Sequence, residues 1–404
     1  MTPATAQPVD PGETSGRRTT RRLLVVGVGL LAVAGVVMVG FFVWRSGSPE
    51  GAALAIALAL VSVPFVGGFY GWVDRVHPQP ARYVAAAFVW GAVGAVAIAV
   101  ALSLAAVGLF DADERQAATF VAPVVEESAK GVFLLATFLR GRRVVRGLLD
   151  GLFYAGIVGL GFAFVENILY YTGGYIGDDE TGLSGVSGAT TIFVMRGVLS
   201  PFAHPMFCTS LGLAVGLAVM TKSWWARPFV VLGGWCGSVL LHLLWNGSAS
   251  YGGGVGFVLI YLVLSVVFIA FLVFAVFLRH RRFAAMRRSL SYMAQRGWIP
   301  PEEIPWVTYH GYRVQAREEA RRRAGREAAE RMRRYQRLAA DLAFIHDEVM
   351  LRRPVWRGVE RTAALRAEMD GLREQVLWPA PIDALSQVAP PTPPSRPTMT
   401  PVWR

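Results

Sequence analysis

The chain has few charged side chains for its length. Asp, Glu, Lys and Arg make up 17% of its 404 residues, against roughly 25% in an ordinary soluble domain. Hydrophobic residues reach 54%. This balance argues against a soluble globular protein and favours one embedded in a membrane.

Cysteine is also scarce, and familiar metal motifs are missing. Only Cys208 and Cys236 are present, which excludes a disulfide framework and a CxxC metal site. Both lie in apolar runs, and we interpret them as packing thiols. No HExxH sequence occurs, so spacing alone does not establish a zinc site.

The net charge of +12 does not indicate a nucleic-acid-binding protein. The basic residues stand in short clusters beside apolar runs and near the end of the chain, and not in a patch interleaved with aromatic residues. We therefore expect no nucleic-acid partner. Basic clusters beside apolar runs are typical of the cytoplasmic loops of a membrane protein.

Long apolar runs dominate the chain up to about residue 280. A bilayer core needs about 20 apolar residues per helix, and this rule predicts an all-α, polytopic membrane protein with about eight transmembrane helices. The first run is too long for a signal-peptide core and lacks an A-x-A-like cleavage site, so we interpret it as a retained helix. The predicted spans are 23–44, 51–73, 83–109, 118–139, 148–172, 190–220, 226–248 and 254–279.

The loops between these spans predict the orientation. Basic residues occur before the first span, in every second loop, and after the last span, whereas two of the alternate loops carry acidic clusters and the last of them is uncharged. Because Lys and Arg concentrate on the cytoplasmic side, we expect a multi-pass protein of the bacterial inner membrane with both termini in the cytoplasm. Arg45 is a basic exception.

Composition divides the chain into four segments. We predict a disordered cytoplasmic N-terminus over 1–22, a transmembrane domain over 23–282, a basic helical cytoplasmic region over 283–378 and a Pro-rich disordered tail over 379–404. The helical region carries a short stripe with 3-and-4 spacing, which is a weak coiled-coil signal. It is either a solvated basic appendage or a helical hairpin that binds a cytoplasmic partner.

Several ionisable residues lie inside the predicted spans, where each costs at least about 2.5 kcal/mol on insertion scales. At 1.5 Å per residue, the acids of the fourth and fifth spans and the imidazoles of the sixth and seventh fall at a similar depth in the outer half of the membrane. These spans therefore predict one shared polar pocket. The residues concerned are Glu126, Glu127, Lys130, Glu166, His204, His242 and Asn246.

Such a pocket has the groups that peptide hydrolysis needs. A carboxylate can activate water, an amide can stabilise an oxyanion, and two imidazoles with a carboxylate can bind zinc. We predict Glu166, His204 and His242 as ligands if a zinc ion is bound, with Glu126 or Glu127 as the base. Lys130, one helical turn from Glu126, can hold that carboxylate ionised.

Four motifs in order resemble the PrsW family of intramembrane proteases, within the wider CAAX-prenyl-endopeptidase-like group. They are EESAK from Glu126, DGLFYAGIVGLGFAFVEN from Asp150, HPMFCTSLG from His204 and HLLWN from His242. The resemblance covers roughly residues 82–248. It implies cleavage of a single-span membrane protein near the outer surface, with an anti-sigma factor as the substrate in one branch. It also implies that Asn246 is an oxyanion donor, and the wider group leaves a metal-free, glutamate-dependent mechanism open.

Two other functions fit an intramembrane polar pocket. An ion-coupled transporter could use the acids as a proton relay, but the sequence shows no inverted repeat. A membrane scaffold could use the same groups only to hold helices together, at about 0.6 kcal/mol each. A Glu127→Gln substitution separates these readings, because a scaffold should keep its function and a protease should lose it.

Overall fold

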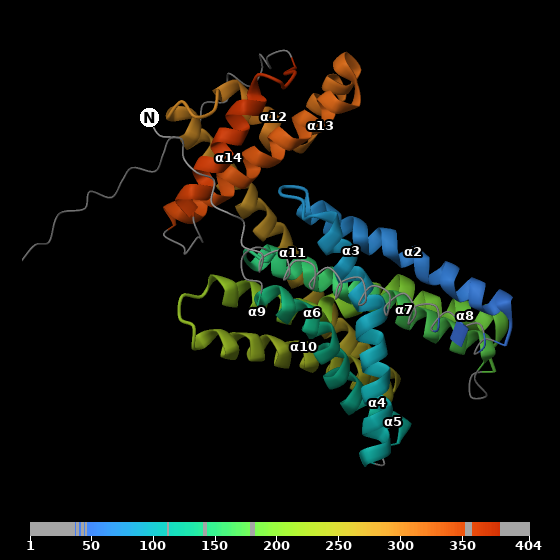
Figure 1. The fold of residues 1–404 in the computed structure, drawn as a ribbon. Coiled ribbons are helices and arrows are strands. Elements are labelled where there is room, and N and C mark those ends of the chain that lie inside the picture. The colour runs from blue at the N-terminus through green and yellow to red at the C-terminus, as the bar shows by residue number, and fades with distance from the viewer. Residues whose placement is uncertain are drawn as a thin grey trace, which may run out of the picture. The chain divides into compact units, whose positions relative to one another are not determined.

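A computed structural model describes residues 47–110, 113–139, 144–177, 182–351 and 358–379, with four further positions before residue 47. Every regular element in these residues is helical, which confirms the all-α prediction (Figure 1). The chain divides into two compact units. The membrane unit comprises Met1–Asp74 and Gln79–Val276, and the C-terminal unit comprises Arg75–Pro78 and Phe277–Arg404.

Six helical segments of the described residues are long and apolar enough to cross a membrane. They are Pro49–Asp74, Ala81–Leu109, Leu148–Ile176, Gly185–Met220, Ala226–Tyr251 and Gly253–Gln295. The protein is therefore embedded in a membrane, but the expected count of eight spans is not confirmed. Most of the predicted first span lies outside the described residues, and the predicted fourth carries three charged residues within α6 (Ala122–Leu139).

Helix α7 (Leu148–Ile176) is the core of the membrane unit. It packs against α9 (Ala203–Met220), α2 (Pro49–Asp74), α8 (Gly185–Phe193) and α3 (Ala81–Val89). Glycine makes this packing close. A Cβ atom at Gly159 would lie 2.7 Å from the backbone nitrogen of Pro205. The absent side chain thus lets α7 approach the backbone beside His204.

The helices around α7 are interrupted by π-helical turns. These are η1 (Trp90–Ala95), which leads into α4 (Val96–Phe110), η2 (Ala117–Val121), which joins α5 (Glu114–Gln116) to α6, and η4 (Val194–Leu199) before α9. Such turns often mark functional positions. Between η4 and α9 the helix breaks, because Ser200 has φ −132° and ψ 43° and Pro201 has no N–H to continue it.

Helices α6, α9 and α10 (Ala226–Tyr251) pack against one another (Figure 1). Ser238 of α10 accepts a hydrogen bond from the backbone N–H of Leu211, and its side chain is fully buried. Gly131 and Gly234 lie at the contacts of α6 and α10 with α9. These small residues bring together three of the four helices that carry the predicted acids and imidazoles.

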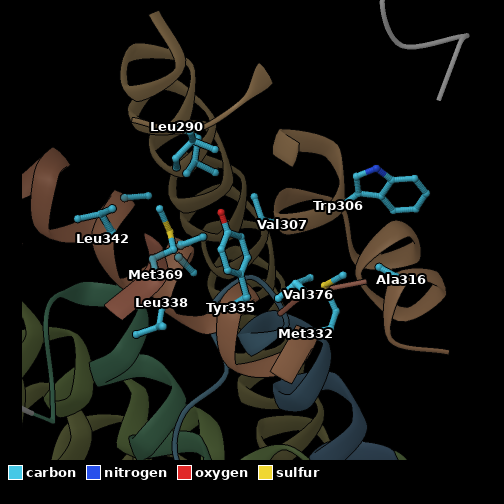
Figure 2. Close-up of a cluster of buried hydrophobic side chains, with 14 of the residues drawn as sticks. Leu290, Trp306, Val307, Ala316, Met332, Tyr335, Leu338, Leu342, Met369 and Val376 are labelled. Carbon is cyan, nitrogen blue, oxygen red and sulfur yellow. The ribbon is translucent and has the colours of Figure 1, made fainter. Parts of the chain in front are cut away.

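The C-terminal unit has a hydrophobic core of its own (Figure 2). It is built from the end of α11 (Gly253–Gln295), η5 (Pro301–Glu303), α12 (Ile304–Thr308), α13 (His310–Met350) and α14 (Gly358–Arg373). The predicted stripe at Ala328, Met332 and Tyr335 is fully buried in this core, whereas Val349 is exposed. Much of the stripe therefore packs within the unit, and helix α13 bends at Gly325, which has φ 75°.

The loop that joins α2 to α3 belongs to the C-terminal unit. Arg313 of α13 donates a hydrogen bond to the carbonyl oxygen of Val76, and His77 Nε2 lies 2.8 Å from Asp341. The predicted domain boundary at 282 remains an expectation. The structural division lies at Val276 and also assigns residues 75–78 to this unit.

Candidate active site

Six of the predicted site residues form one connected cluster in the membrane unit. They come from four helices: α6 contributes an acid pair and a lysine, α7 one acid, and α9 and α10 one imidazole each. Every connection is a direct contact between side chains. The cluster consists of Glu126, Glu127, Lys130, Glu166, His204 and His242.

The ammonium group of Lys130 lies at the centre of this cluster. Its Nζ atom is 2.8 Å from Glu127 Oε1, 3.2 Å from Glu126 Oε2 and 3.1 Å from His204 Nδ1. It also lies 3.8 Å from the centre of the Phe162 ring, which adds a cation–π contact. The side chain is 1% exposed. Two carboxylates and an imidazole therefore compensate the buried positive charge.

Each imidazole is held by a carboxylate of its own. His242 Nδ1 lies 3.1 Å from Glu127 Oε1, and His204 Nε2 lies 2.5 Å from Glu166 Oε2. Because Lys130 can only donate, His204 Nδ1 accepts from it, and the ring proton sits on Nε2 and points to Glu166. In His242 the contact of Nδ1 with Glu127 leaves Nε2 available as a ligand or a base. In His204 the opposite nitrogen, Nδ1, is occupied by Lys130.

Glu166 is also paired with an arginine of the π-helical turn before α9. Arg196 Nη2 donates to the same Glu166 oxygen, and Arg196 Nε donates to Asn167 Oδ1 at 2.9 Å. Its guanidinium stacks on Tyr170, 3.8 Å from the ring centre. From the sequence, Arg196 could pair either with Glu166 or with lipid headgroups, and the structure shows the first. The clearest signal for including it would have been its intramembrane position.

The donor set of the cluster fits a transition-metal ion such as zinc. Single ligand atoms of Glu126, His204 and His242 lie within 4.8 Å of one another, and two imidazoles with one carboxylate are a known catalytic zinc set. Glu126 thus stands where the sequence analysis expected Glu166. The predicted ligand Glu166 contacts His204 and Arg196 instead, and its role as a ligand stays a prediction.

The three acids of the cluster differ in how far their side chains are exposed. The side chain of Glu127 is 1% exposed, whereas those of Glu126 and Glu166 are 12% and 14% exposed. Cys208 Sγ also contacts Glu127 at 3.4 Å, so this thiol belongs to the wall of the cluster. Water and substrate can therefore reach Glu126 and Glu166 more readily than Glu127.

A small polar cavity adjoins the cluster. It is lined by Asn167, Arg196 and His204, together with the broken segment Ser200–Pro201, Ala163, Ala203 and Trp245. Its volume is about 10 Å³, close to the minimum of about 10–15 Å³ that one water needs. We refer to it as the polar cavity.

Asn246 is placed apart from these contacts. Its Nδ2 donates to the carbonyl oxygen of Ala118 at 2.8 Å, within the π-helical turn η2. The amide thus ties α10 to the start of the helix that carries the acid pair. Its predicted role as an oxyanion donor stays a prediction.

Buried acids and imidazoles beside a water-sized cavity, carried by apolar membrane helices, define a class of membrane-embedded enzymes that activate water. Residues 79–276 match the PrsW family intramembrane metalloprotease model, and all six cluster residues lie in the matched segment. The chain therefore carries an intramembrane protease domain and is an enzyme that hydrolyses peptide bonds. No curated protein and no solved structure matches the chain.

Proposed function

We propose that the protein is an intramembrane endopeptidase that cleaves a single-span membrane protein near the extracytoplasmic surface. The observation that carries the proposal is the cluster. In it, each of two imidazoles contacts its own carboxylate, and a third carboxylate, Glu126, lies near both imidazoles. His204 of this cluster also lines the polar cavity. The family match supports proteolysis as the activity. The predicted depth of the cluster, in the outer half of the membrane, supports the side of cleavage.

The residues that would hold a metal ion are Glu126, His204 and His242. Glu166 and Glu127 orient the two imidazoles from behind, an arrangement that also raises the basicity of the ligand nitrogens. A bound zinc ion would polarise the scissile carbonyl and lower the pKa of its bound water. Because Lys130 now contacts Glu126 and His204 Nδ1, its ammonium has to move aside when a cation is bound.

Glu166 is the carboxylate that we assign as the base. It is partly accessible, and its partners His204 and Arg196 both line the polar cavity. Glu166 takes a proton from the water in that cavity as the water oxygen adds to the scissile carbonyl carbon. The proton then passes to the amine nitrogen as the C–N bond breaks. Arg196 supplies positive charge for the oxyanion.

The cellular location, the orientation and the substrate class are those that the sequence indicates. We propose a bacterial inner-membrane protein with both termini in the cytoplasm and a place in the wider CAAX-prenyl-endopeptidase-like group. The substrate is a single-span membrane protein, such as an anti-sigma factor in regulated proteolysis. The C-terminal helices remain available to a cytoplasmic partner.

Paired glutamine variants test the assignment of the two accessible acids. The full-length protein is purified in detergent, bound metal is measured by mass spectrometry, and cleavage is assayed on a panel of single-span substrates. We expect Glu126→Gln to lose both metal and cleavage, whereas Glu166→Gln keeps the metal and loses cleavage. Glu50→Gln, at an exposed position of α2, is the matched control and should retain both.

Other outcomes assign the mechanism differently. Metal lost with Glu166→Gln and retained with Glu126→Gln restores the ligand set expected from the sequence. Cleavage by a wild-type protein that holds no metal establishes the glutamate-dependent mechanism. If the folded wild-type protein cleaves nothing in the panel, the endopeptidase proposal fails and an ion-coupled transporter becomes the favoured function.

A further inference from the structure

A second cavity of the membrane unit lies next to the polar cavity. It is partly open and is lined by the broken segment before α9, by Trp245 of α10 and by residues of α11. The two cavities share four lining residues, namely Ser200, Pro201, Ala203 and Trp245. We refer to this second space as the apolar cavity. A group bound in it would lie directly beside the space where His204 and Arg196 meet water.

The lining of the apolar cavity is mostly hydrophobic, with Ser200, Tyr261 and Ser265 as its hydroxyl-bearing residues. Met206, Leu264 and Phe268 contribute side chains from α9 and α11, and the rings of Phe202 and Phe268 pack 4.9 Å apart. No Asp, Glu, Lys or Arg lines it. An apolar wall with little hydrogen-bonding capacity binds an apolar group and rejects a charged one.

The backbone around the apolar cavity is irregular in a way that membranes rarely tolerate. Non-helical backbone occurs at membrane depth only where it is buried in protein or lines a water-filled space. Ser200 and Pro201 of the break line both cavities, and Tyr261 donates to the carbonyl oxygen of Leu199 at 2.9 Å. The break is thus held open by α11 at the point where the two cavities meet.

From this geometry we infer that the apolar cavity is the specificity pocket for a small aliphatic side chain of the substrate, next to the bond that is cleaved. The inference rests on the proposed endopeptidase function. Its occupant follows from continuity with the polar cavity and from size. The volume is about 60 Å³, well under the roughly 150 Å³ of a cavity that admits benzene. Alanine or valine fits such a space, and phenylalanine does not.

Two variants of α11 change the size of the pocket in opposite directions. Ser265→Phe fills it, because the Ser265 side chain lines the cavity. Leu264→Ala enlarges it, because Leu264 is 3% exposed and also lines it. Val266→Phe is the matched control, since it makes an aromatic change on the same helix at a side chain that is 68% exposed. None of the three positions belongs to the cluster.

The test uses one single-span segment cleaved by the full-length protein in detergent. After the cleavage site is mapped, Ala, Val, Leu, Phe and Arg are placed singly at each position flanking it, and kcat/KM is measured for each. At one flanking position, wild type should prefer Ala and Val over Phe and Arg by about 10-fold or more. Ser265→Phe should lose Val relative to Ala there, Leu264→Ala should gain Leu and Phe, and Val266→Phe should match wild type.

The outcomes separate the pocket from the proposed function. Cleavage with the same preference in wild type, Ser265→Phe and Leu264→Ala overturns the pocket and leaves the endopeptidase standing. A preference that changes equally in Val266→Phe also overturns it, because the effect is then not local to the cavity. Failure of wild type to cleave any segment overturns both. If Ser265→Phe does not fold, Leu264→Ala still decides, because it needs no added volume.

Discussion

Both units of the chain bury ionisable side chains, but the two units arrange them differently. In the membrane unit, three carboxylates, two imidazoles and an ammonium from four helices meet in one cluster beside a cavity. In the C-terminal unit, Glu303 pairs with Tyr335 and Arg373, and Arg313 caps backbone carbonyls of the 75–78 loop. The first arrangement adjoins a water-sized cavity, and the second sits inside a packed core.

The comparison separates buried charge that performs chemistry from buried charge that holds a fold. Groups that act on a substrate must converge and keep an accessible face, as Glu126 and Glu166 do. In the C-terminal unit, burial raises the pKa of Glu303, while its contacts with Tyr335 and Arg373 oppose that shift. Each of these partners is satisfied within the core, so we assign Glu303 a structural role.

The largest expected effect comes from a pair of substitutions, one in each unit, that tests this comparison directly. Glu127→Gln removes the carboxylate that orients His242, and loss of such a partner typically costs about 10–100-fold in metal affinity or activity. Glu303→Gln should leave cleavage unchanged. Bound metal and kcat/KM of the two full-length variants decide the point. Equal losses in both would show that the cluster is not the distinct functional site.

A packing prediction concerns the contact that places His204. Gly159→Ala puts a methyl group 2.7 Å from the Pro205 nitrogen and 2.8 Å from the His204 carbonyl oxygen, and backbone atoms cannot move aside easily. We expect a loss of about 1–3 kcal/mol in stability, together with reduced cleavage. Thermal unfolding in detergent, followed by tryptophan fluorescence, measures the first effect.

Gly173→Ala is the control for this prediction. Gly173 lies on the same helix, and a Cβ atom there would meet nothing within 4 Å. Since alanine is a better helix former than glycine, this variant should unfold at the same or a slightly higher temperature. A loss of stability like that of Gly159→Ala would show that α7 tolerates no substitution, and that close approach to α9 is not the cause.

The sequence predicted contacts within one helix better than contacts between helices. Lys130 stands three and four residues from the acid pair, and helical periodicity fixes such neighbours, so the structure confirms that pairing. Depth arithmetic correctly grouped the acids and imidazoles. It gives the level of a residue in the membrane but not the direction in which its helix faces. The sequence therefore predicted Glu166 as the carboxylate grouped with the two imidazoles, whereas the structure places Glu126 there.

Contacts between helices also determined the surroundings of residues that the sequence pattern alone could not place. The buried stripe of α13 has a spacing that fits a coiled coil or an internal core, and only the positions of α12 and α14 show that it is internal. Arg196 joins the site because η4 ends beside α7, and no sequence spacing relates those two elements. The interaction of Asn246 with Ala118 likewise needed the path of η2.

A third prediction sharpens the structural side of the comparison. Tyr335 is fully buried, and its hydroxyl donates to Glu303 and accepts from Arg373 Nη2 at 3.1 Å. Tyr335→Phe leaves the buried Glu303 carboxylate short of a hydrogen bond, which costs about 1–3 kcal/mol. We expect faster amide hydrogen exchange in α13 and α14, and unchanged cleavage. Tyr312→Phe, whose hydroxyl makes no hydrogen bond among the described residues, should exchange like wild type.

The smallest expected effect is a pH dependence of the C-terminal unit. Burial lowers the pKa of His346, and Asp347 partly opposes this shift. Because the folded pKa lies below the unfolded value of about 6.5, the stability that His346 contributes is present above pH 6.5. It is lost as pH falls through the folded pKa. Hydrogen exchange of α13 should therefore quicken, relative to the intrinsic rate, as pH falls below about 6.5.

His346→Gln tests whether this residue is the source. The ring packs against Tyr292, with the two centres 5.0 Å apart, and Nδ1 lies 3.4 Å from Ser289 Oγ. Glutamine keeps a polar side chain but cannot gain a proton in this range. The difference in the exchange rate of α13 between high and low pH should therefore shrink in the variant. An unchanged difference would assign the pH dependence to other groups, and His346 would then be a packing residue alone.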